Sequence, residues 1–225
     1  MKKLLLPLPF VLLTFSMVAN NVIADGRVIL GSFELLSEEY DAPYFADSVS
    51  RESSMNGFSA KLYRFQTDGL YGGMGLGYMA GDVEICLEAT CASVDTTFSR
   101  YSFEIGWDLG QWIPFVGGSW TTTEPEETRF GFVFGDSERY YGFNPGYVVE
   151  STADTFGVHT GVWREFGTFK VRGALNILEE SERIGISGGV LFQMDNKFAV
   201  GAELEMLLES EASGFRFSLQ FGRSF

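Results

Sequence analysis

The chain has 225 residues, and its 30 acidic and 16 basic side chains give a net charge of −14 at pH 7. So acidic a surface repels nucleic acid and excludes it as a partner. After the first segment, no apolar stretch approaches the roughly 20 residues that a membrane-spanning helix needs. The remaining classes are a soluble exported domain and a membrane barrel, and the many short alternating segments rich in aromatic residues and glycine favour the barrel.

The first 24 residues have the features of a secretory signal peptide. Lys2 and Lys3 precede an apolar run over 4–19, and Val22 and Ala24 then stand at the spacing that signal peptidase recognises. The run is too short for a membrane anchor and contains prolines. We therefore expect cleavage after Ala24, which leaves residues 25–225 as one exported domain.

Segments with alternating apolar and polar residues predict the strands. The first predicted strand is 27–36, and the polar stretch 37–56 is predicted to be a long loop. A hairpin is expected in 57–82, because Asp68-Gly69 is a strong signal for a tight turn between two strands.

The facing of this hairpin is ambiguous. If Tyr63, Phe65 and their partners face lipid, strict alternation sends Lys61 to the lipid as well. Either a bulge intervenes, or the opposite face, which carries Arg64, is the lipid side.

Cys86 and Cys91 fall in a predicted loop between strands. An exported protein resides in a compartment that permits oxidation, so we expect a disulfide that closes a small external loop. A metal site would need further ligands, and the loop offers only Glu84 and Glu88.

The next predicted hairpin is 97–122, with its turn near Leu109-Gly110. A two-residue turn would place Trp107 opposite Trp112 at one membrane boundary, where amphipathic rings accumulate. The second strand has an open register, since apolar residues occupy both of its faces.

The insertion 123–153 combines acids with aromatic residues. We expect it to form a hairpin that stands above the membrane, with its aromatic residues packed on one another. The alternative is a contact surface for an extracellular ligand.

The remaining predicted strands lie in 154–178, 184–209 and 214–225, with short turns near Gly167 and Asn196. In each of them one face is apolar and the other is polar. Polar residues in mid-strand cannot face hydrocarbon, so the polar faces are expected to point into a lumen. This inward set comprises Arg100, Glu104, His159, Lys170, Arg172, Glu203 and Glu205.

Counting these segments predicts an all-β fold, a closed antiparallel transmembrane β-barrel of about 10 strands, with about 8 or 12 as alternatives. The export signal, the strand series and the aromatic last strand resemble the small bacterial outer-membrane β-barrel proteins, the group of opacity-type and OmpA-type barrels. The resemblance implies a bacterial outer-membrane location among lipid and lipopolysaccharide. It also implies that Phe221 and Phe225 form the signal for the barrel-assembly machinery.

The interior of a barrel this narrow is expected to be filled by side chains. The predicted function is therefore a non-enzymatic structural or surface-interaction barrel without a cofactor. A small passive or selective channel is the alternative, and an outer-leaflet lipid-modifying enzyme is a distant one. His159 is the only histidine, and no nucleophile motif surrounds it, so no catalytic residue is predicted.

Overall fold

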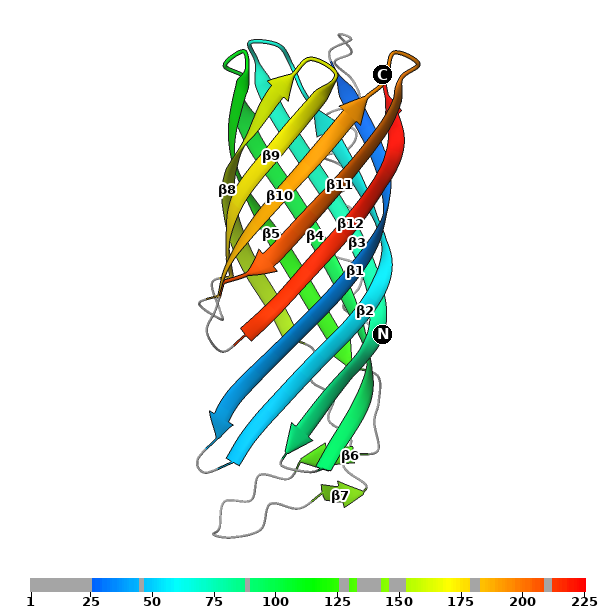
Figure 1. The fold of residues 1–225 in the computed structure, drawn as a ribbon, viewed down its shortest axis with the longest axis vertical. Coiled ribbons are helices and arrows are strands. Elements are labelled where there is room, and N and C mark those ends of the chain that lie inside the picture. Colours follow the sequence, from blue (N-terminus) through cyan, green and yellow to red (C-terminus); the bar gives the residue numbers. More distant parts are fainter. Residues whose placement is uncertain are drawn as a thin grey trace, which may run out of the picture.

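The computed structural model describes residues 26–44, 47–87, 90–125, 130–132, 143–145, 153–178, 183–208 and 212–225. Ten antiparallel strands form a closed barrel in the order β1-β12-β11-β10-β9-β8-β5-β4-β3-β2 (Figure 1). The barrel strands are β1 (Arg27–Tyr44), β2 (Asp47–Arg64), β3 (Leu70–Leu87), β4 (Thr90–Trp107), β5 (Trp112–Pro125), β8 (Ala153–Phe166), β9 (Phe169–Leu178), β10 (Arg183–Gln193), β11 (Phe198–Leu207) and β12 (Ala212–Ser224). Within the described residues, no helix is long and apolar enough to cross a membrane.

The predicted all-β barrel and its strand number are confirmed. Two further strands, β6 (Phe130–Phe132) and β7 (Phe143–Pro145), pair with each other in a separate two-stranded sheet. In the part of the insertion that the structure describes, β6 and β7 therefore add no strand to the barrel wall, in line with the expected hairpin apart from it. The rest of this insertion and the predicted signal peptide lie outside the described residues.

Short turns join the strands at one end of the barrel. Positive φ angles occur there at Asp68, Gly110, Gly167 and Lys197. The three-residue turn predicted at 195–197 is present, because the backbone N–H of Met194 donates to the carbonyl of Phe198 across it. We refer to this end as the turn edge. Short turns are typical of the periplasmic side of outer-membrane barrels.

The prediction of a loop over 37–56 is wrong. β1 continues to Tyr44, and β2 begins at Asp47, so most of this stretch is a regular hairpin. β1 to β4 have 18 residues each, whereas β9 and β11 have 10. The four long strands project beyond the shorter strands at the end opposite to the turn edge, as Figure 1 shows. We call this projecting part of β1–β4 the extension.

The structure resolves the facing of the first hairpins. Lys61, Tyr63 and Phe65 all point into the barrel, so no bulge is needed, and the opposite face of β2 is the lipid side. The pairing of Trp107 with Trp112 is wrong. The loop between β4 and β5 is longer than two residues, and the ladder places Gly106 opposite Phe115.

Large apolar side chains cover the outer face of the barrel. Leu76, Phe103 and Leu175 expose about half of their surface, at 48%, 54% and 52%. Water-soluble proteins rarely expose so extensive an apolar surface, whereas it is favourable in hydrocarbon. Exposed aromatic rings end this band at the turn edge: Trp107, Trp112, Phe166, Phe192, Phe198 and Phe225. Such a girdle is typical of a membrane boundary.

Candidate functional site

The inside of the barrel contains a charged chamber at mid-height. A row of inward glycines on β3, Gly73, Gly75 and Gly77, makes room for it, since a Cβ there would lie 2.6 to 3.3 Å from side-chain atoms of neighbouring strands. The charged residues that line the chamber are Glu34, Lys61, Arg100, Glu104, His159, Arg172, Glu203, Glu205 and Arg216. The four lysine and arginine side chains match the four carboxylates in number.

Arg172 connects two of these carboxylates. Its guanidinium donates to Glu104 at 2.5 Å, to Glu203 at 3.3 Å and to the Ser187 hydroxyl at 2.8 Å. Glu203 also accepts from Lys61 at 2.5 Å. These ion pairs link β2, β4, β9 and β11 across the lumen and fix the relative positions of these strands.

A second group of ion pairs centres on Glu205. This carboxylate contacts Arg216 and accepts from Arg100 at 3.1 Å and from Asn176 at 2.6 Å. Breaking buried ion pairs of this kind is strongly destabilising, because one charge then remains without its partner.

Six of the residues predicted to face inward lie together in this chamber: Arg100, Glu104, His159, Arg172, Glu203 and Glu205. Lys170 also points inward, but it lies near the turn edge, where it pairs with Glu165 and contacts the Phe65 ring at 4.8 Å. The predicted inward set did not include Lys61, Arg216 or Glu34, although the facing of Lys61 was left open and Arg216 was placed on the polar face of the last strand. The alternation of Lys61 with Tyr63 and Phe65 was the available signal for Lys61.

His159 is buried between Glu104 and an aromatic ring. Its Nε2 atom lies 3.3 Å from Glu104 Oε1 without the alignment of a hydrogen bond, and its ring centroid lies 6.2 Å from that of Phe115. No described residue acts as a hydrogen-bond partner of Nε2. This environment positions no nucleophile beside the imidazole within the described part of the chain.

Apolar and aromatic side chains fill the lumen between the chamber and the turn edge. Tyr63, Phe65, Tyr71, Phe115 and Trp163 are at most 6% exposed and contact one another, and we call them the aromatic plug. The Trp163 indole donates to the Tyr71 hydroxyl at 2.9 Å, and that hydroxyl donates to Glu104 at 2.5 Å. Hydrogen bonds thus attach the plug to the chamber.

The free space in the chamber is small. Its cavity volume is about 50 Å³. This is room for a few water molecules, since one water occupies about 10 to 15 Å³ of such a cavity. Together with the plug, this space indicates a filled barrel rather than an open pore.

The extension has the opposite arrangement of polar and apolar faces. A buried apolar cluster of Leu36, Met55, Met79 and Val83 lies on the inner side where the extension begins. The outer side of the extension carries carboxylates in neighbouring register, with Glu52 opposite Glu84, and Asp82 opposite Asp95.

Asp82 and Asp95 interact directly across β3 and β4. A side-chain hydrogen bond from this pair raises the pKa of Asp82 above its ordinary value of 3.8, with smaller contributions from desolvation and from the charge of Asp95. The two carboxyl groups therefore favour sharing a proton.

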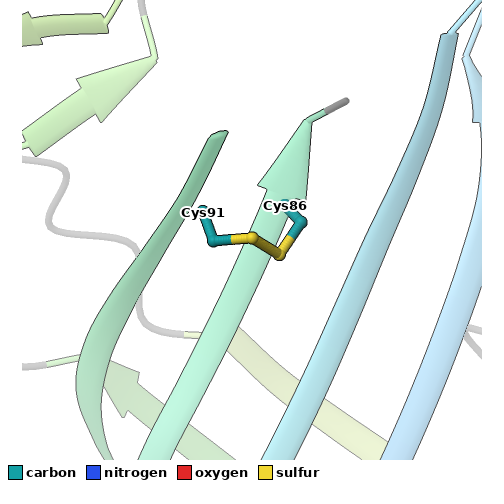
Figure 2. The surroundings of a disulfide bond; sticks show 2 residues. All are labelled: Cys86 and Cys91. Atoms are coloured by element: carbon teal, nitrogen blue, oxygen red, sulfur yellow. A yellow bond between two sulfur atoms is a disulfide. The ribbon is translucent and has the colours of Figure 1, made fainter. Parts of the chain in front are cut away.

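The predicted disulfide between Cys86 and Cys91 is present and joins β3 to β4 (Figure 2). The two residues are partners in the ladder, so the disulfide joins paired strands near the end of the extension rather than closing a separate loop. Glu84 lies close to both sulfur atoms, but cysteines in a disulfide do not provide thiolate ligands for a metal.

The last strand closes the barrel against the first. β12 pairs with β1 from Ser224 opposite Val28 to Ala212 opposite Tyr40. Phe221 and Phe225 lie on its outer face with exposed fractions of 47% and 56%. Their role as an assembly signal stays a prediction.

No protein-family model and no curated protein matches the chain. Among solved structures, the attachment invasion locus protein Ail of Yersinia pestis, in complex with the heparin analogue sucrose octasulfate, matches with a TM-score of 0.44 and 10% identity over 90% of this chain and 100% of that chain. The β-domain of the Bordetella autotransporter BrkA matches at 0.49 and 11% over 89% and 100%. The translocator domain of autotransporter NalP from Neisseria meningitidis matches at 0.49 and 10% over 96% and 94%. No role is transferred from similarities at this level.

The fold and the distribution of its side chains define the class of the protein. A closed antiparallel barrel with an apolar outer band, an aromatic girdle and charges inside is a transmembrane β-barrel. The resemblance to small outer-membrane barrels is confirmed at the level of this architecture.

Proposed function

We propose that this protein is a non-enzymatic, non-conducting barrel of the bacterial outer membrane that acts through its extension at the cell surface. The filled lumen is the observation that carries the proposal, because the plug and the ion pairs leave room for only a few water molecules. The surrounding lipid and lipopolysaccharide are the proposed environment, and the barrel-assembly machinery is the proposed partner in insertion.

The extension supports a surface role. Its outer face is polar and acidic, it stands beyond the apolar band, and a disulfide joins β3 to β4 near its end. A barrel that only filled a place in the membrane would not need 18-residue strands, since about 9 to 11 residues per strand cross a bilayer. An extracellular ligand at the insertion 123–153 is part of the same proposal.

The lumen is tested by conductance of the purified, refolded protein in a planar bilayer. We expect no steady openings above the baseline of the bilayer. Reproducible ion-conducting openings would support the channel alternative and reject the filled-lumen proposal.

The surface role is tested with shortened hairpins. Residues 38–53 and 83–94 are each replaced by Asn-Gly, which joins Ser37 to Ser54 and Asp82 to Asp95, pairs that face each other in the ladders. We expect the shortened chain to insert and to keep its heat-modifiable mobility on gels. Failure to fold would mean that the extension serves the barrel itself, which contradicts a role directed at a partner.

A further inference from the structure

An arginine on the outer face near the turn edge lies between two aromatic rings. The guanidinium carbon of Arg164 lies 4.6 Å from the ring centroid of Trp112 and 4.7 Å from that of Phe166. Trp112 is the ladder partner of Arg164 on β5, and Phe166 follows two residues later on the same face of β8. The backbone register therefore sets the position of both rings around this cation.

Arg164 has no anionic partner in the described part of the chain. No carboxylate there forms an ion pair with it, and no described group accepts a hydrogen bond from it. The neighbouring Glu165 pairs with Lys170. The contacts of Arg164 are the two ring faces, which leave the N–H groups at the edge of the guanidinium free to donate.

The position of Arg164 relative to the membrane indicates which kind of anion it would bind. Trp112 and Phe166 are 45% and 42% exposed and belong to the aromatic girdle at the turn edge, where hydrocarbon gives way to headgroups. The phosphate of a glycerophospholipid lies at that depth, and guanidinium binds phosphate through two parallel hydrogen bonds. The exposed rings beside it offer apolar surface to the adjoining glycerol and upper acyl chain.

We propose that Arg164, Trp112 and Phe166 form a binding site for the phosphate group of a glycerophospholipid in the leaflet at the turn edge. The site goes beyond the proposed function and does not depend on whether the lumen conducts.

Native mass spectrometry of the intact protein in detergent tests this site, with phosphatidylglycerol as the probe. Arg164→Gln is compared with Arg223→Gln, a matched control because Arg223 lies near the same edge over a single ring, 5.8 Å from the centroid of Phe225. We expect Arg164→Gln to weaken the tightest binding by about tenfold, the scale of one lost charge-assisted contact, and Arg223→Gln to change it by less than about twofold. Equal losses in both variants would indicate general charge attraction and overturn the proposal.

Two further measurements identify the ligand. Diacylglycerol, which lacks the phosphate, should bind at least about tenfold more weakly than phosphatidylglycerol, and millimolar inorganic phosphate should not displace the lipid. Equal binding of diacylglycerol, or complete displacement by free phosphate, would each overturn the assignment to a phospholipid. Arg164→Lys keeps the charge but loses the planar fork, so it should bind with intermediate affinity. If Arg164→Gln does not fold, unchanged affinity in Arg164→Lys and in Phe166→Leu would reject the site.

Discussion

The embedded part of β3 and its extension have the same period but opposite apolar faces. In the embedded part, Leu76 and Tyr78 point outward with exposed fractions of 48% and 55%, and glycines point inward. Beyond them, Met79 and Val83 are buried on the inner side, and Asp82 faces outward. The change occurs where the surroundings change from lipid to water, since the solvent decides which face is apolar. Alternation thus predicts a strand, and the polarity of its outer face indicates whether lipid or water surrounds it.

The largest effect is expected inside the embedded part. Arg172→Leu removes the cation shared by Glu104 and Glu203 and should cost about 3 to 5 kcal/mol of unfolding free energy, because two buried carboxylates lose their common partner. Urea unfolding in lipid vesicles measures this loss. Arg100→Leu is the control, since the Arg100 side chain is 19% exposed against 5% for Arg172, and it should cost less. Equal costs would mean that burial of the ion pair does not decide its importance.

In the extension, loss of an apolar side chain is expected to lower stability locally. Met79→Ala removes a side chain that is 1% exposed and should cost about 2 to 5 kcal/mol, as other large-to-small changes in cores do. Hydrogen exchange should show faster opening of the extension, with little change in β9 to β11. Uniformly faster exchange over the whole barrel would show that the two regions unfold as one unit.

The two outer faces should respond differently to the same charge. Leu204→Arg places a cation on the lipid face and should cost about 2 to 4 kcal/mol near the midplane. Ser54→Arg on the outer face of the extension should change stability by less than about 0.5 kcal/mol, as surface substitutions do. A comparable loss at both positions in vesicle unfolding would place the extension in the bilayer.

The smallest expected effect is a pH dependence confined to the extension. Because Asp82 has a raised pKa, its pairing with Asp95 stabilises the folded hairpin most below the ordinary value of 3.8, and this stabilisation is lost as pH rises through the raised value. Hydrogen exchange of β3 and β4 beyond the apolar band should therefore slow on acidification, after correction for the intrinsic rate. Asp95→Asn should remove this dependence, and an unchanged profile in that variant would assign the effect to other groups.

Alternation and tight-turn residues were sufficient to predict the barrel and its strand number. Asp68-Gly69 and the turn before Phe198 predicted two hairpins. In the second hairpin, the alternation of apolar and polar residues predicted which faces of β10 and β11 point outward. The stretch 37–56 was predicted to be a loop because its outward residues are polar. A strand surrounded by lipid would have apolar residues at those positions. Its inner residue Met55 packs with Leu36, Met79 and Val83 from the two neighbouring strands, a relation that one segment cannot reveal.

The candidate site was predicted in part. Most inward-facing charged residues were predicted from the alternation of polar and apolar residues. Their ion-pair partners depend on the register between neighbouring strands, which the alternation does not give. Lys61 meets Glu203 across 142 residues of sequence, and no local pattern contains that separation. The aromatic plug was not predicted: the register of the strand that carries Ile113 and Phe115 was left open, and both side chains face inward.

The matched charges of the chamber have an electrical consequence for the whole molecule. With four cations facing four carboxylates, the chamber is neutral as a unit and needs no counterions from the medium. The entire excess of −14 therefore resides elsewhere on the chain, including the acidic outer side of the extension. An approaching molecule meets a negatively charged body whose embedded centre exerts almost no field, so salt concentration should alter its encounters with partners far more than the integrity of its wall.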